Sequence, residues 1–85
     1  MSEAVGAKLK KLSQTNQVLC VTHQPQIARF ADRHLLVQKE VVAGRTVVSV
    51  EKLDRRGRVE EIARMLTGAE ITESARCHAR EMLRT

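Results

Sequence analysis

A single histidine follows the first continuous apolar run of the chain. The run covers residues 18–21 ("VLCV"), and Thr22, His23 and the pair Gln24-Pro25 come directly after it. A short run that is apolar at every position is typical of a strand buried on both faces of a sheet. Because open α/β sheets bind ligands at the carboxyl ends of their strands, an imidazole there could donate a hydrogen bond to a phosphate group. The alternative is a surface loop with an incidental histidine, and these residues alone leave both interpretations open.

The other residues that could do chemistry form no recognisable constellation. Cys20 and Cys77 match no zinc-binding spacing, and they predict two reduced thiols instead of a disulfide framework. Along an extended strand Cys20 and His23 would lie on opposite faces, so we expect no metal ion between them. We expect His34 at the surface or at a sheet edge, and His78 packed beside the apolar stripe of a helix.

The hydrophobic pattern places these residues on seven elements. Apolar residues at helical spacing, period-two alternation, and breaks at Gly and Pro define their limits. We expect helices over 2–14, 25–31, 59–66 and 72–84, strands over 18–21, 35–41 and 46–53, a turn at "AGR" (43–45) and a loop at "DRRG" (54–57). The alternation in 46–53 predicts one solvent-facing side for that strand.

The last two expected helices have the clearest apolar stripes. The residues expected to face the core are Val59, Ile62, Ala63 and Leu66 in the first helix and Ala75, Ala79 and Met82 in the second. On the outer face Glu60 and Arg64 stand at the i,i+4 spacing of a helical ion pair. Glu60 and Glu61 are both expected to project into solvent.

The expected order α-β-α-β-β-α-α predicts a mixed α/β fold. The strand at 18–21 and the helix after it suggest a crossover to a parallel neighbour, and the next two strands form an antiparallel hairpin at the edge of the sheet. The chain has 85 residues and one aromatic residue, Phe30, so it makes one small domain without large aromatic anchors. This composition suggests a part of something larger.

The formal net charge is +5, which is compatible with a polyanionic partner. Lysine and arginine are not gathered in one tract, and many of them lie in three separate segments, Lys8–Lys11, Arg55–Arg58 and Arg76–Arg84. No aromatic residues are interleaved with them, as base stacking would require. We therefore expect at most weak binding of nucleic acid that does not read sequence.

Three stretches together resemble a known family. They are "QVLCVTHQPQIARFADRHLLVQK", "GRTVVSVEKL" and "RVEEIARMLTGAEITESARCHAREML". The resemblance is to the C-terminal end of the bacterial RecN family, an SMC-like branch of the ABC-type ATPases. It covers nearly the whole chain, and "VEEIARMLTGAEITE" is its most specific part. It implies that residues 1–85 are a single C-terminal fragment of an ATPase head domain, containing the H-loop strand, an edge hairpin and the C-terminal helices.

The resemblance also implies a role for His23. The residue matches the switch histidine of the H-loop, which contacts the γ-phosphate of ATP, so it is the one catalytic and cofactor-binding residue expected here. ATP and Mg²⁺ are implied as cofactors of the complete protein. The sequence contains no G-x-x-x-x-G-K-[ST], no "LSGG"-type signature and no strand ending in Asp-Glu. We therefore expect neither ATP hydrolysis nor a cofactor for the fragment alone, and no metal site.

The resemblance also implies binding partners and a cellular location. They are the remainder of the RecN head in the same chain, DNA through the complete protein, and a second copy in a homodimer. The parent activity would be recombinational repair of DNA double-strand breaks. No signal peptide or transmembrane pattern is present, so we expect a cytoplasmic, nucleoid-associated protein without a membrane partner. The alternative is a freestanding small basic module that binds nucleic acid or protein.

Overall fold

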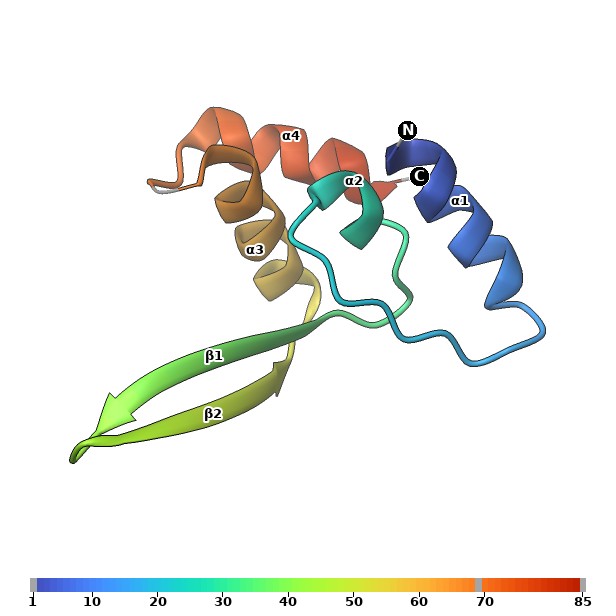
Figure 1. Ribbon diagram of the computed structural model, residues 1–85. Coiled ribbons are helices and arrows are strands. Elements are labelled where there is room, and N and C mark those ends of the chain that lie inside the picture. Colours follow the sequence, from blue (N-terminus) through green and yellow to red (C-terminus); the bar gives the residue numbers. More distant parts are fainter. Residues whose placement is uncertain (1, 69, 85) are drawn as a thin grey trace.

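The computed structural model describes residues 2–68 and 70–84. Within them the elements are α1 (Ser2–Leu12), α2 (Pro25–Ala28), β1 (Leu35–Val42), β2 (Arg45–Lys52), α3 (Arg55–Thr67) and α4 (Glu73–Arg84). Figure 1 shows α2, α3 and α4 gathered around a common centre, with the hairpin projecting to one side and α1 at the other. The mixed α/β class predicted from the sequence is confirmed.

The core lies where α3 and α4 pack against each other and against α2. Both predicted apolar stripes face it, and Ile62, Ala63 and Ala79 are fully buried. Ile62 is the largest fully buried side chain among the described residues, and alanines supply much of the rest. Half-buried Met65, Leu66, Ile71, Met82 and Leu83 surround this centre. The core is therefore small, and it stabilises the helices of the C-terminal half of the chain.

Capping residues set the limits of α3 and α4. The Asp54 carboxylate accepts a hydrogen bond from the Gly57 backbone N–H at 2.7 Å, so α3 begins at Arg55. The expected loop at 54–57 is wrong, because this cap turns the segment into the first turn of a helix. Gly68 ends α3 in the left-handed region at φ 79°, and the Thr72 hydroxyl accepts from the Ala75 N–H at 3.1 Å at the start of α4.

The charged residues on α3 pair differently from the expectation. Glu61 is 9% exposed and accepts two hydrogen bonds from the Arg64 guanidinium at 2.8 and 2.5 Å. Glu60 instead reaches across to Arg76 on α4, at 2.7 Å from its Nε. The predicted Glu60–Arg64 pair is therefore wrong, and Glu61 does not project into solvent. The packing of α3 against α4 brings Glu60 beside Arg76, while Glu61 lies on the buried side of α3.

The hairpin agrees closely with its prediction. β1 and β2 pair antiparallel from Leu35 opposite Lys52 to Val42 opposite Arg45. This register leaves a two-residue turn in which Ala43 has φ 52° and Gly44 has φ 77°. Positive φ at both positions is the geometry of a type I′ turn, whose twist matches that of the flanking strands.

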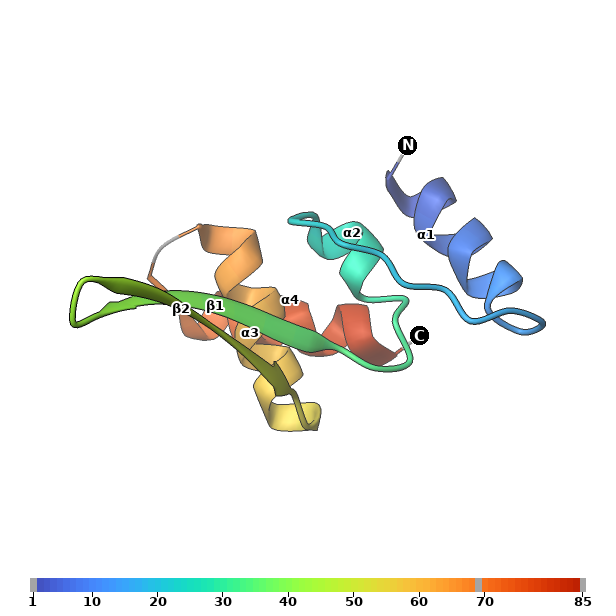
Figure 2. The same ribbon diagram turned by 60° about the horizontal axis from the view of Figure 1, so that its bottom comes forward.

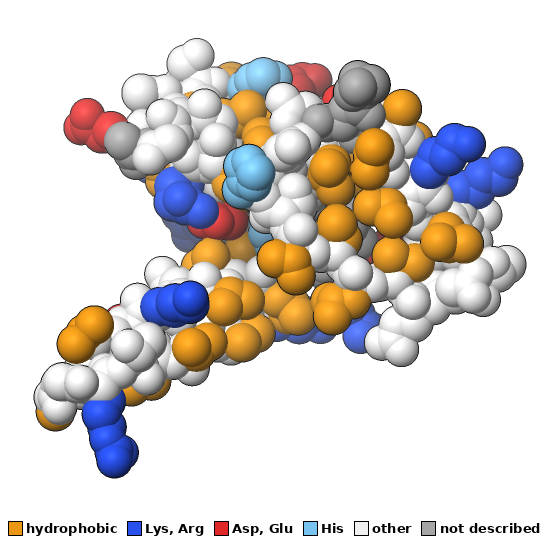
Figure 3. Space-filling model, viewed as in Figure 1, with side chains coloured by type: hydrophobic (Ala, Val, Ile, Leu, Met, Phe, Trp, Pro, Cys, Tyr) orange, Lys and Arg blue, Asp and Glu red, His pale blue; other side chains and the backbone are white. Residues whose placement is uncertain are grey.

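Both faces of the hairpin are exposed, whereas the sequence predicted a solvent-facing side for its second strand only. Cross-strand pairing groups the side chains into one largely apolar face and one largely polar face. The hydrophobic residues exposed on the apolar face are Leu35, Val37, Val41, Val48 and Val50. Figure 2 shows the hairpin extending beyond the helices, and Figure 3 shows hydrophobic side chains along its length. An apolar sheet face of this kind normally packs against another layer.

Residues 18–21 do not form the expected strand. The segment from residue 17 to residue 22 has no regular secondary structure, and the described sheet contains β1 and β2 only. The expected parallel pairing with the next strand is therefore wrong. The physical reason is that β1 pairs with β2 along one edge while its other edge does not meet residues 18–21, and a strand exists only as part of a hydrogen-bonded ladder.

Helix α1 packs chiefly against α2. A Cβ at Gly6 would lie 2.3 Å from the ring atom Cδ2 of Phe30, so only glycine allows this approach. Ion pairs of Glu3 with Arg29 and of Lys10 with Asp32 hold the two segments together. The radius of gyration is 14.0 Å, whereas a compact chain of this length has about 12 Å. The fold is therefore more open than that of an independent globular domain.

Candidate functional site

The loop that carries His23 is fixed by its neighbours on both sides. The Thr22 hydroxyl accepts a hydrogen bond from the Gln24 backbone N–H at 3.0 Å, which closes a local turn around His23. Gln24 then adopts an extended conformation (φ −100°, ψ 117°), as a residue before proline prefers, and Pro25 opens α2. His23 is therefore held at a defined point between an extended segment and a helix, by the turn around it and by Gln24 and Pro25 after it.

The imidazole of His23 is available to a ligand. The residue is exposed, and it makes no hydrogen bond or ion pair with the described part of the chain. A neutral imidazole has one N–H donor and one acceptor nitrogen, so it can donate to a phosphate oxygen. The structure therefore agrees with the sequence in placing His23 in a loop, although that loop does not lie at the edge of a parallel sheet here.

The chain that leads to His23 is apolar and uncovered. Leu19 is 84% exposed and Val21 is 96% exposed. Full burial of an aliphatic side chain of this size stabilises a fold by about 1.5–3 kcal/mol, and neither residue contributes this here. The backbone of residues 17–22 also takes no part in the described sheet. The segment thus has the composition of a buried strand without the surroundings of one.

His34 directly precedes β1, and its backbone carbonyl accepts a hydrogen bond from the Leu53 N–H at 2.9 Å, so it lies at the sheet as predicted, but its side chain is more covered than a surface position. It is half-buried, and within the described residues its Nδ1 is covered without a hydrogen-bond partner, as are Nε and Nη2 of Arg58. Burial, followed by the nearby Arg58 guanidinium, lowers the pKa of the His34 imidazole below its ordinary value. Burial also lowers the pKa of Arg58, and the charge of Arg55 adds to this effect. His34 is therefore part of a partly buried polar cluster and lies 11 residues along the chain from His23.

The remaining candidates are at the surface. His78 is exposed, so the prediction that it packs beside the helical stripe is wrong, because α4 turns Ala75 and Ala79 toward α3 instead. Cys20 and Cys77 are both free and exposed. Among the described residues no group of three His, Cys, Asp or Glu side chains could hold a metal ion. None of the described helices combines the length and apolar character needed to cross a bilayer.

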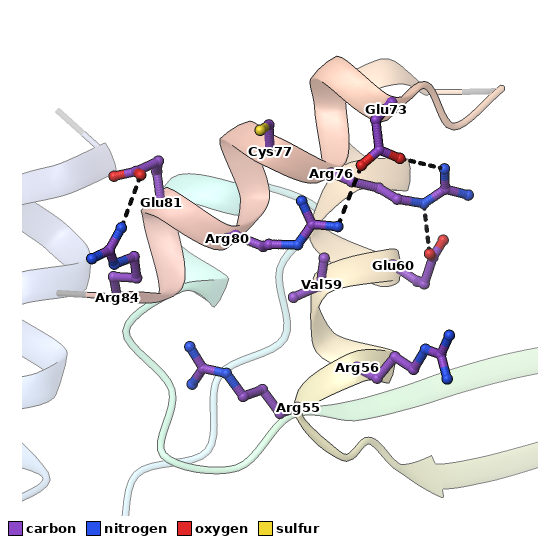
Figure 4. Close-up of a pocket in the computed structure, with 10 residues that line it drawn as sticks. All are labelled: Arg55, Arg56, Val59, Glu60, Glu73, Arg76, Cys77, Arg80, Glu81 and Arg84. Atoms are coloured by element: carbon purple, nitrogen blue, oxygen red, sulfur yellow. Dashed lines mark hydrogen bonds and ion pairs between the residues drawn. The ribbon is translucent and has the colours of Figure 1, made fainter.

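A second candidate site was not recognised from the sequence. Arginines from two of the three basic segments line one groove of about 910 Å³ between α3 and α4, shown in Figure 4. The arginines are Arg55, Arg56, Arg76, Arg80 and Arg84. The sequence could have predicted this groove. The apolar stripes of the two helices face each other, and so the arginines that flank the stripes come together.

Comparison with known proteins gives a consistent result. The chain is 43% identical over 84 residues to the DNA repair protein RecN of Bacillus subtilis, a match that covers 99% of this chain. It is 47% identical to the RecN proteins of Vibrio cholerae over 79 residues and of Streptomyces coelicolor over 81 residues, covering 93% and 95% of the chain. The chain matches the C-terminal part of RecN. No family model matches it.

The matched region is a small share of each RecN relative. The chain spans 15% of the Bacillus subtilis protein and 14% of the Vibrio cholerae and Streptomyces coelicolor proteins. The similarity to RecN predicted from the sequence is therefore confirmed for a segment. It connects this chain with proteins named for DNA repair.

Proposed function

We propose that these 85 residues form the C-terminal part of a RecN-type ATP-binding head that acts in recombinational repair of DNA double-strand breaks. The observation that carries the proposal is identity of 43–48% to RecN proteins along 93–99% of the chain. In this role the protein works in the cytoplasm, at the nucleoid. The unit is a single C-terminal segment of the head, and its activity depends on the remainder of that head.

The exposed apolar surfaces support this proposal. A second layer against the hairpin and a neighbouring strand beside residues 18–21 would cover the hydrophobic residues that are most exposed. Leu19 and Val21 alone are 84% and 96% exposed, and the apolar face of the hairpin adds five more side chains. We assign the missing cover to the upstream part of the head, which would convert residues 18–21 into an interior strand.

In the assembled head we propose that His23 is the switch histidine. The Thr22 hydrogen bond and Pro25 fix the turn, so the imidazole can donate to an oxygen of the γ-phosphate without being a nucleophile. ATP with Mg²⁺ supplies the phosphoryl group and the charge neutralisation that its transfer requires. We assign the cradling of the phosphates and the holding of Mg²⁺ to upstream residues, because this sequence has no G-x-x-x-x-G-K-[ST].

A chimeric protein tests the proposal. These 85 residues would replace the matching C-terminal part of Bacillus subtilis RecN, and steady-state ATP hydrolysis and cell survival after DNA breakage would be measured. We expect the chimera to restore both, relative to RecN truncated at the junction. His23→Ala should lower ATP turnover by about 10–10³-fold, the scale on which loss of one positioned donor acts. His78→Ala, another exposed histidine, serves as the matched control and should leave turnover unchanged.

Two outcomes would contradict the proposal. If the chimera folds, as shown by a cooperative melting transition, but neither hydrolyses ATP nor supports survival, then the segment does not serve a RecN head. If His23→Ala and His78→Ala hydrolyse ATP equally well, then His23 is not the switch histidine, whatever the chimera does in cells.

The alternative, a freestanding basic module, is favoured by one observation, the arginine-lined groove between α3 and α4. A freestanding domain covers its own core. Under this alternative the isolated chain should therefore be a stable monomer. The exposed apolar face of the hairpin and the large radius of gyration favour instead the proposal that the chain is part of a RecN-type head.

A further inference from the structure

Two groups of arginines that are separated in the sequence meet in the fold. Arg55 and Arg56 belong to the first turn of α3, and Arg76, Arg80 and Arg84 follow one another at four-residue intervals along α4. That interval places the three on one face of the helix. Because α3 and α4 pack through their apolar stripes, both groups line the same groove (Figure 4). Arginines that are dispersed in the sequence are thus gathered in one groove, together with three glutamates.

The arginines of α3 stand where positive charge is unfavourable. The first turn of α3 contains no acidic residue, and Arg55, Arg56 and Arg58 all follow directly after the cap. A cation near a helix N-terminus is destabilising, because it opposes the helix dipole. Arg58, which lies outside the groove lining, has its pKa lowered first by burial and then by the charge of Arg55. An anion bound beside Arg55 and Arg56 would offset their unfavourable interaction with the helix dipole.

The glutamates of the groove are already engaged with arginines on α4. Arg76 lies between Glu60 and Glu73, at 2.7 and 3.3 Å, and Arg80 donates to Glu73 at 3.4 Å. These contacts hold the guanidinium groups in place while leaving some of the five N–H donors of each arginine unused. The hydrogen bond to Glu60, with the charge of that carboxylate, raises the pKa of Arg76, so its positive charge is secure.

Arg55 and Arg56 differ from the arginines of α4. Neither makes a hydrogen bond or ion pair within the described residues, and Figure 4 shows them extending in opposite directions from the start of α3. Both side chains are exposed. The groove therefore combines arginines held by carboxylates with two that are free to bind a ligand.

We propose that this groove binds the phosphodiester backbone of duplex DNA without reading its sequence. Guanidinium groups suit phosphate because two parallel N–H groups can bind two of its oxygens. The lining contains no aromatic residue for base stacking, and its apolar residues are only Val59, 9% exposed, and Cys77. A protein partner would find little apolar area to bury there. The choice of DNA over another polyanion rests on the proposed function in DNA repair.

Charge-reversal variants of the 85-residue chain test the proposal. Binding to a fluorescein-labelled duplex would be measured by anisotropy over a range of salt concentrations, without nucleotide. We expect Arg55→Glu with Arg56→Glu to weaken binding at least about tenfold at low salt. The slope of log affinity against log salt should fall by about 2, since each phosphate contact contributes about 0.9. The matched control is Arg33→Glu with Arg45→Glu, which changes the net charge equally at exposed sites outside the groove and should keep the slope.

The same variant separates binding from folding. Glutamates in the first turn of α3 favour the helix dipole, so we expect the melting temperature to stay equal or rise while DNA binding falls. Arg55→Lys with Arg56→Lys keeps both charges and should keep most of the binding. If the glutamate variant loses helical content, the comparison of the lysine variant with Arg55→Gln and Arg56→Gln decides the question in its place.

Three results would overturn the proposal. The first is no binding of the duplex even at low salt, and the second is an equal loss of affinity in the groove variant and its control. The third is that poly-glutamate competes as strongly as unlabelled duplex, which would make the groove a site for an acidic protein segment. Because these titrations contain no ATP, their outcome is independent of the test of His23 in the chimera.

Discussion

At the scale of single residues, hydrogen bonding decides which side chains are available for function. His23 is exposed and has no partner among the described residues, in a turn held by the Thr22 hydroxyl at 3.0 Å from the Gln24 nitrogen. His34 has the opposite surroundings, because its Nδ1 is covered beside the unpaired nitrogens of Arg58. One histidine can therefore reach a ligand, whereas protonation of the other would place a second positive charge in a partly buried cluster.

We expect His34 to make the stability of the chain depend on pH. Burial and Arg58 lower its pKa below the ordinary value of 6.5, although Glu61 acts in the opposite direction. The unfolded chain therefore binds more protons as the pH falls below about 6.5. The contribution of His34 to stability is complete above that pH and is lost as the pH falls toward its folded-state pKa.

Thermal melting of the wild type and of His34→Gln at pH 7.5 and 5.5 would test this. The wild type should lose more of its melting temperature on acidification than the variant does. The carboxylates of Glu3 and Asp32, whose pKa values are lowered by hydrogen bonds from Arg29 and Lys10, titrate below this range and do not interfere. Equal losses in both proteins would show that His34 is not the titrating group.

At the scale of elements, the capping residue fixes the start of α3, which hydrophobic periodicity placed too late. The stripe on α3 predicted its buried face correctly, but the helix begins earlier than the stripe suggests. The Asp54 carboxylate accounts for this difference, because it accepts the Gly57 N–H and closes the first turn. A Cβ at Gly57 would lie 3.2 Å from that carboxylate oxygen, so glycine allows the close approach. The cap also positions Arg55 and Arg56 at the groove.

We expect Asp54→Ala to lower the free energy of unfolding by about 1 kcal/mol, the usual effect of removing an acidic N-cap. Chemical denaturation followed by circular dichroism would measure it. Glu40→Ala removes an exposed carboxylate of the hairpin that caps no helix, and it should have a much smaller effect. Similar losses in the two variants would mean that the general charge balance matters and the cap does not.

At the scale of the whole molecule, the distribution of apolar surface indicates a segment that needs a partner. The core is centred on α3 and α4, while eleven large hydrophobic residues of the described chain are exposed. They lie on α1, on the segment before His23 and on the hairpin. Exposed apolar patches and unpaired strands both promote association. In the proposed head the upstream part would cover these surfaces.

Without that upstream part we expect the isolated chain to form a homodimer, by pairing of strand edges or by exchange of an element such as α1. Light scattering across a dilution series should show a dimer that dissociates as the concentration falls. Leu19→Lys with Val21→Lys should shift the equilibrium toward the monomer. Gln14→Lys with Gln17→Lys adds the same charge at exposed polar positions and should shift it less. A monomer at every concentration would show that the chain covers its own core.

The sequence by itself determined the mixed α/β class, the apolar stripes of α3 and α4, the limits of the hairpin and the loop position of His23. These features depend on interactions between residues close together in the chain, such as the positive φ at Gly44 and the helical spacing of Ile62 and Ala63. Interactions of this short range follow from the local sequence, which is why these predictions were correct, whereas the local cap at Asp54 was missed.

Only the tertiary structure decided what lies beside each element. Residues 18–21 have the composition of a strand but no ladder partner in the described part of the chain, since pairing is a property of two segments and not of one. The packing of α3 on α4 likewise turned Glu60 toward Arg76 and brought together arginines about twenty residues apart in sequence. Both depend on the relative placement of distant segments, which periodicity and composition do not contain.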